Sequence, residues 1–89
     1  LAAIVLLLGS RNLSVQRTAP LVLGNISQDD RNRHRIGVAG GVEALVLTLT
    51  RADDAQVRIN CLWALSNLAW NSGNQERIGR FFEELLDMC

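Results

Sequence analysis

The sequence repeats at a fixed interval of 42 residues, and this period limits the possible folds more than any other feature. Seven of the 23 residues between positions 15 and 37 recur identically between positions 57 and 79. A period of this length is typical of arrays of helical units, in which each unit buries its apolar face only by stacking on its neighbours. We therefore expect an all-α fold whose function is binding. The recurring residues are Val15, Leu23, Asn25, Asn32, Arg35, Ile36 and Gly37, matched by Val57, Leu65, Asn67, Asn74, Arg77, Ile78 and Gly79.

The chain has 89 residues, which leaves room for fewer than the roughly three repeats that an array needs for stability. The apolar run from Leu1 to Leu8 has no cap before it, as expected of a helix that has been cut. This run lacks a basic leader and is shorter than the ~20 residues that span a membrane, so we predict a buried helix. We also expect further repeats of the same chain at both ends, and self-association of the isolated segment through its apolar ends.

Composition and cysteine usage argue against several function classes. Nine basic and nine acidic residues cancel, so no overall field favours nucleic acid or a membrane surface. Cys61 and Cys89 have no paired spacing, which suggests a reducing compartment, the cytoplasm or the nucleus. His34 has no metal-ligand pattern around it, and no glycine-rich phosphate loop or nucleophile–base motif is present. We expect no metal, no cofactor and no enzymatic activity.

A long helix is predicted from Ala55 to Asn71. Asp53 and Asp54 come just before it, and their carboxylates can accept hydrogen bonds from the free amides of its first turn. The apolar residues follow helical spacing and predict one buried stripe. This stripe comprises Val57, Cys61, Ala64, Leu65 and Leu68.

The earlier copy predicts an equivalent long helix, with Asn12 as its capping residue. Pro20 interrupts the pattern, because proline inside a helix removes one backbone hydrogen bond at a cost of ~3 kcal/mol. Either the helix is kinked or starts later, or Pro20 belongs to its first turn. The expected stripe is Val15, Ala19, Val22, Leu23 and Ile26.

The remaining part of each unit contains two shorter helices. Polar turns at 28–30 and 71–73 each precede a short helix, and Gly40 with Gly41 then predicts a sharp reversal. A medium helix follows at Val42 to Thr50, and Leu1 to Leu8 aligns with it at the same 42-residue shift. The unit is therefore a short helix, a glycine corner, a medium helix and a long helix.

This order, with two glycines before VEALV and the later segment CLWALSNLA, resembles the armadillo repeat. The resemblance covers the chain to about Gly79 and implies a right-handed α-solenoid with three helices per repeat. It divides the chain into the end of one repeat (1–30), a complete repeat (31–72) and the start of a third repeat or an irregular cap (73–89). Phe82 and Glu83 stand where the earlier copy has its two glycines. The last segment, Arg80 to Met88, is then either one continuous helix or that irregular cap; its apolar residues would be Phe81, Phe82, Leu85 and Leu86.

Three residues of the later long helix, Trp63, Asn67 and Trp70, form a candidate binding ladder at positions i, i+4 and i+7. An asparagine amide can donate to and accept from a peptide backbone regardless of its sequence. Indole faces can attract a Lys or Arg head at about 0.5–2 kcal/mol per contact. The ladder therefore suits an extended, Lys- or Arg-rich peptide.

Trp63 and Asn67 are similar to the ladder of the importin-α family, in which long helices line a concave groove that holds nuclear localisation peptides. In the earlier copy Asn25 is present, but Leu21 replaces the tryptophan. The resemblance implies a protein-interaction module that binds an extended segment on the concave face. One alternative is importin-α-like binding of nuclear localisation signals, and another is a structural link in a scaffold, cytoskeletal or ciliary assembly. If the role is structural, Trp63 and Trp70 would pack against neighbouring helices or the next repeat.

A basic cluster at positions 31–35 has two interpretations. In the first, the cluster binds an acidic or phosphorylated partner. In the other, Arg35, which recurs as Arg77, stabilises the repeat by hydrogen bonds to helix-end carbonyls, while Arg31, Arg33 and His34 are solvated. No aromatic residues are interleaved with these charges, which argues against nucleic-acid binding. Cys61 aligns with Ala19 on the apolar stripe, and we expect it to be a small buried residue.

Overall fold

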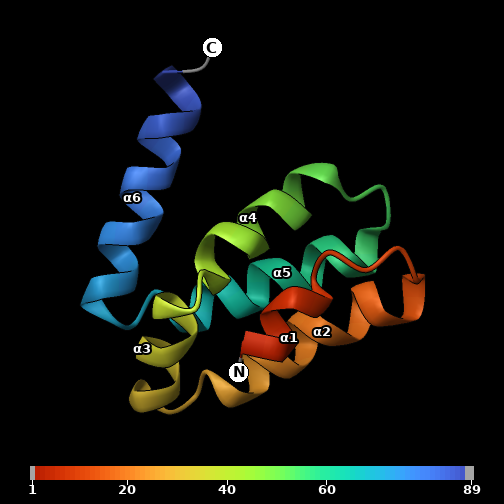
Figure 1. Cartoon of the computed structure of the whole chain (residues 1–89), viewed down its shortest axis with the longest axis horizontal. Helices are drawn as coiled ribbons and strands as arrows, with labels where there is room; N and C mark the ends of the chain where they lie inside the picture. Colours follow the sequence, from red (N-terminus) through yellow and green to blue (C-terminus); the bar gives the residue numbers. More distant parts are fainter. Residues whose placement is uncertain (1, 88–89) are drawn as a thin grey trace.

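The computed structural model describes residues 2–87, apart from the side chains of Leu85 and Leu86. Predictions that involve Leu1, Met88 and Cys89 lie outside the described residues. Within residues 2–87 every regular element is helical, and none of these helices is both long and apolar enough to cross a membrane (Figure 1). The helices are α1 (Ala2–Leu7), α2 (Leu13–Ile26), α3 (Asp30–Val38), α4 (Gly41–Arg51), α5 (Ala55–Leu68) and α6 (Ser72–Asp87).

The helix starts repeat at the same 42-residue interval as the sequence. Asn12 caps α2, because its side chain accepts a hydrogen bond from the Val15 amide at 3.2 Å. Asp54 caps α5 in the same way, with its carboxylate 3.0 Å from the Val57 amide. Both caps were predicted from the sequence. Each satisfies an amide that the first turn of a helix leaves without a partner.

The two long helices carry most of the predicted stripes. On α5 the stripe is buried except for Leu65, which is half-buried, and the helix ends at Leu68, three residues before the predicted end. Helix α2 continues through Pro20, whose ring is fully buried. The later start and the first-turn position for Pro20 were both wrong. The Asn12 cap fixes the start well before the proline, and Pro20 removes only one backbone hydrogen bond.

A glycine corner joins α3 to α4, as predicted. Gly40 has φ of 86°, a left-handed conformation that residues with a Cβ rarely adopt. Gly41 comes next to Ile36, and a Cβ at Gly41 would lie 2.9 Å from the Ile36 carbonyl oxygen. The first glycine therefore provides the reversal and the second allows close packing of α4 on the end of α3.

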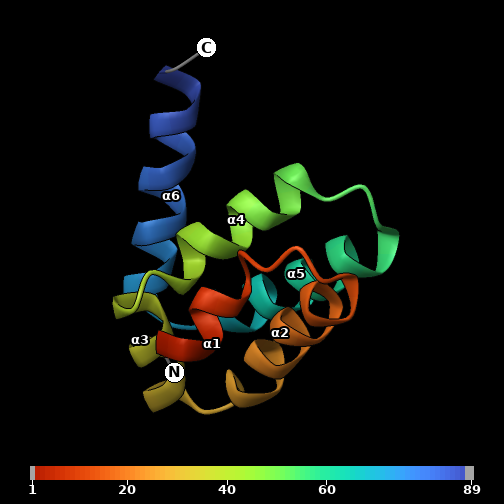
Figure 2. The same ribbon diagram turned by 45° about the vertical axis from the view of Figure 1, so that its right-hand side comes forward.

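The long helices α2 and α5 lie side by side, with α4 packed on α5 and α1 packed on α2 (Figures 1 and 2). This stacking of two repeats builds one core between them. The prediction of a buried helix at the start was only partly right, because Val5 is buried within α1 but Leu6 is 80% exposed. A single helix can turn only part of its circumference toward α2 and α4. The core contains Val5, Leu8, Ala19, Leu23, Ile36, Val42, Leu45, Val57, Cys61, Ala64 and Leu68.

Helix α6 departs from the earlier repeat. It contacts α3 and α4 near its start and then projects away from the body (Figures 1 and 2). It runs without a break through Phe82 and Glu83, where the earlier copy has the glycine corner. The structure thus has the continuous helix as far as Asp87, and not the irregular cap. Residues with a Cβ at this point disfavour the left-handed conformation that made the earlier corner.

Candidate functional site

Two residues of the predicted ladder, Trp63 and Asn67, lie where the two long helices meet, at Gly24 of α2. The Trp63 indole packs directly on Gly24, and a Cβ at that position would overlap its ring. The side-chain amide of Asn67 donates to the Gly24 carbonyl, with a nitrogen–oxygen distance of 2.9 Å. The structure therefore brings Trp63 and Asn67 to the chain segment that precedes Asn25.

Asn67 has a structural role in this arrangement. Gly24 lies in the last turn of α2, where backbone carbonyls lack partners within the helix. Donation from Asn67 satisfies one of them and joins α5 to α2. Asn60, two turns earlier on the same side of α5, also joins the two helices by donating to the Arg17 carbonyl of α2 at 2.8 Å. These two bonds bridge the repeats, so one amide hydrogen of Asn67 is already used.

The other ladder residues are more open to solvent. Asn25 is exposed, and Leu21, which replaces the tryptophan in the earlier copy, is 41% exposed. Trp63 is half-buried, while Trp70 is 76% exposed in the turn that follows α5. We call Leu21, Asn25, Trp63, Asn67 and Trp70 the long-helix face. It combines exposed apolar area with two amide side chains.

An ion pair joins α2 to the start of α5. Two bonds link the Arg17 guanidinium to the Asp54 carboxylate, at 3.0 Å and 2.7 Å. The bond from Arg17, followed by the bond from the Val57 amide, lowers the pKa of Asp54 to about 2. Asp54 is therefore both the cap of α5 and a bridge to the preceding repeat.

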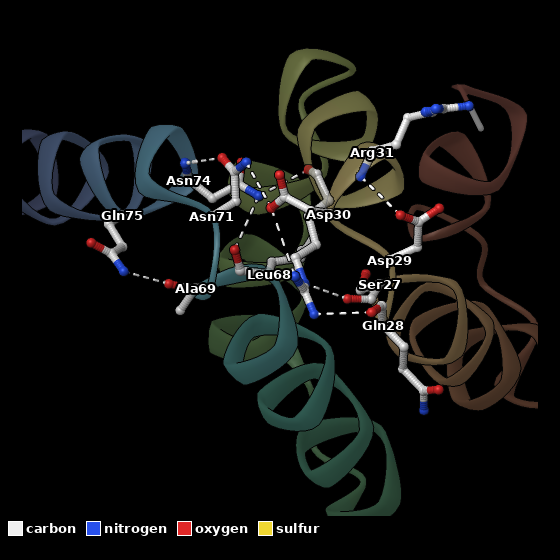
Figure 3. Close-up of polar contacts among 11 residues, drawn as sticks. Ser27, Gln28, Asp29, Asp30, Arg31, Leu68, Ala69, Asn71, Asn74 and Gln75 are labelled. Carbon is white, nitrogen blue, oxygen red and sulfur yellow. Dashed lines mark hydrogen bonds and ion pairs between the residues drawn. The ribbon is translucent and has the colours of Figure 1, made fainter.

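A second polar network lies at the opposite ends of the long helices (Figure 3). Asn74 is fully buried, and its amide donates to the carbonyls of Arg33 and Leu68, at 2.9 Å and 3.1 Å. Its oxygen accepts from Arg77 at 2.8 Å. Asn71 donates to Asp30 at 3.2 Å, across the same boundary between repeats. This network holds the start of α6 against α3. The recurrence of Asn32 as Asn74 and of Arg35 as Arg77 was the sequence signal for this network.

The prediction for the basic cluster was wrong about which arginine binds helix-end carbonyls. Arg33 donates to the carbonyls of Ser27 and Gln28, at 2.7 Å and 3.0 Å, and only 19% of its side chain is exposed. Arg35 is exposed. The geometry explains the difference, because Arg33 points back along the α2–α3 turn. Arg31 and His34 are exposed, as predicted.

The two acidic residues of the same turn have local roles. Asp29 caps α3 by accepting from the Arg31 amide at 3.2 Å (Figure 3). Asp30 lies 3.7 Å from the Arg33 guanidinium and accepts from Asn71. Cys61 is buried in the core, and this burial raises the pKa of its thiol to about 11, so the thiol is not poised for reaction. Among the described residues no three metal-ligating side chains gather into a possible metal site.

Comparison with known families identifies the repeat. Residues 29–70 match the family model described as Armadillo/beta-catenin-like repeat. These residues have the sequence pattern of an armadillo repeat. The match runs from Asp29, the cap of α3, to Trp70, just after α5, so the matched segment comprises α3, α4 and α5. No curated protein and no solved structure matches the chain significantly. Armadillo repeats are generally non-enzymatic modules that bind protein partners.

Proposed function

We propose that this armadillo segment binds an extended segment of a partner protein on its long-helix face. The observation that carries the proposal is the convergence of Trp63 and Asn67 on Gly24, next to the exposed Asn25. This convergence creates a surface that crosses both long helices. Exposed amides there can bind a peptide backbone, and the indoles provide apolar walls.

The remaining hydrogen-bonding capacity defines what the partner can contact. Asn67 has used one amide hydrogen on Gly24, which leaves its side-chain oxygen for a peptide N–H. Asn25 is exposed, and no hydrogen bond of its side chain is formed within residues 2–87. Trp70, with most of its indole exposed, can cover an aliphatic or basic side chain of the partner. We therefore place backbone capture at the two asparagines and side-chain contact at the tryptophans.

The test is a fluorescence titration that uses the two tryptophans as reporters. A Lys-rich extended peptide and a neutral peptide of equal length are added to the chain and to its Asn25→Ala and Trp70→Phe variants. Both substitutions affect exposed side chains, so folding should be preserved and can be checked by circular dichroism. Saturable binding that both variants weaken supports the proposal. Binding that neither variant alters would contradict it.

The two peptides also separate general binding from an importin-α-like specificity. Leu21 stands at the tryptophan position of the earlier copy, and Asp29 and Asp30 are engaged in capping and in contacts with Arg33 and Asn71. These features favour capture of the backbone without strong selection for cations. Similar affinities for both peptides are expected. A large preference for the Lys-rich peptide would instead support binding of nuclear localisation signals.

A structural role is the second candidate, and an apolar cleft on α1 and α2 favours it. The cleft is about 270 Å³ and includes Ile4, Leu7, Val15, Ala19 and Val22. At a shift of 42 residues these positions become Val46, Leu49, Val57, Cys61 and Ala64, which are buried or half-buried. The cleft is thus suited to packing against another repeat. A Val22→Lys substitution should block such assembly, measured by light scattering, without weakening peptide binding.

A further inference from the structure

A large groove lies away from the long-helix face. It has a volume of about 670 Å³ and is formed where the α1–α2 loop meets the α4–α5 loop, at the right of Figure 1. Both repeats contribute to its apolar floor. The floor includes Val5, Leu8, Leu13, Leu47 and Val57. Leu13 and Leu47 remain 44% and 36% exposed, so the groove offers apolar area that folding does not cover.

Two guanidinium groups stand at this groove, and neither is neutralised. Arg11 and Arg51 both line it and are exposed, and within residues 2–87 neither forms an ion pair. Of the two carboxylates at the groove, Asp54 is already held by Arg17, which leaves Asp53. The groove therefore has an apolar floor with an excess of positive charge around it.

The other polar side chains of the groove are satisfied within the chain. Gln16 donates to the Ser10 carbonyl at 2.8 Å, and Thr48 donates to the Ala44 carbonyl at 2.7 Å. Within residues 2–87 this leaves the charged groups of Arg11, Arg51 and Asp53 for a partner. The groove shares no lining residue with the apolar cleft of α1 and α2, so a repeat stacked on that cleft leaves the groove's lining in place.

We propose that this groove is a docking site for a short partner segment in which apolar side chains are flanked by carboxylates. The apolar side chains would lie on the floor near Leu13 and Leu47. The flanking carboxylates would pair with Arg11 and Arg51, which gives orientation as well as attraction. This proposal does not depend on the long-helix face, because none of that face's five residues lines the groove.

The test is a two-dimensional amide NMR titration of the ¹⁵N-labelled full chain. The probe is an acetylated and amidated peptide of sequence Glu-Glu-Leu-Leu-Glu-Glu, and the control peptide has lysine in place of every glutamate. The acidic probe should produce saturable shifts at the loop residues Gly9, Arg11, Ala52 and Asp53, and the basic peptide should not. Combined Arg11→Gln and Arg51→Gln substitutions should weaken binding about tenfold, because each ion pair at an exposed site contributes modestly.

Arg31→Gln is the matched control, since Arg31 is an exposed arginine on α3, away from the groove. It should leave the affinity unchanged. Three results would overturn the proposal: equal binding of the basic peptide, unchanged affinity in the double variant, or shifts centred on Trp63 and Asn67. Groove shifts that appear on raising protein concentration without peptide would also overturn it. They would identify a second copy of the chain as the occupant.

Discussion

The side-chain amide of Asn67 on α5 is bonded to the backbone carbonyl of Gly24 on α2, with a nitrogen–oxygen distance of 2.9 Å. Asn25, the aligned residue of the earlier copy, is exposed. Two asparagines at equivalent positions of the two copies thus have different roles. One joins two repeats, and the other is open to a partner.

Asn67→Ala should therefore destabilise the chain, and Asn25→Ala should not. Loss of the Asn67 bond should lower the free energy of unfolding by about 1 kcal/mol, as for a typical hydrogen bond. Asn25→Ala should change it by less than about 0.5 kcal/mol. Urea denaturation followed by circular dichroism measures both values. Equal losses in the two variants would show that Asn67 has no special role between the repeats.

The Arg17–Asp54 ion pair predicts a dependence of stability on pH. Because the pKa of Asp54 is lowered from 3.8 to about 2 in the folded chain, the pair stabilises the fold above about pH 4. This contribution is lost as the pH falls from about 4 to about 2. The melting temperatures of the chain and of its Arg17→Gln variant should differ at pH 7 and converge near pH 2. A difference that stays constant over this range would contradict the assignment.

Gly24→Ala should lower the stability of the native chain but raise the stability of a Trp63→Leu variant. In the native chain, Gly24→Ala pushes a Cβ into the Trp63 ring and should destabilise by about 1–3 kcal/mol, the usual cost of overpacking. In a Trp63→Leu background, which copies Leu21 of the earlier repeat, the ring is absent. Alanine should then stabilise the helix by up to about 1 kcal/mol, because alanine is the better helix former. A double-mutant cycle by urea denaturation measures the reversal.

Much of the fold could be predicted because its determinants are local or recur. The caps Asn12 and Asp54, the apolar stripe of α5 and the corner at Gly40 follow from residue type and spacing alone. The place of Pro20 could not be predicted in this way. Its position depends on where the cap fixes the start of α2 and on burial of its ring in the core.

Contacts between the repeats were harder to predict, because different side chains make equivalent bonds. Arg33 donates to the Ser27 carbonyl, and 42 residues later Gln75 donates to the Ala69 carbonyl (Figure 3). The two donors differ in charge and shape, so a search for residues identical in both copies does not find them. It finds Arg35 and Arg77 instead. The groove at Arg11 and Arg51 was missed for a related reason, since it arises only when the two loops meet in space.

Asn74 should be the most sensitive asparagine of the chain. It is fully buried and joins Arg33, Leu68 and Arg77 in one network. Asn74→Ala leaves two backbone carbonyls and a guanidinium without this partner, so we expect a loss of about 2–3 kcal/mol in the free energy of unfolding. Asn74→Asp keeps the acceptor for Arg77 but loses both donors, and it should recover little of that loss. Hydrogen exchange should show faster opening at the start of α6 in both variants, while the amides of α2 keep more of their protection. Uniform loss of protection would instead mean that Asn74 supports the whole core.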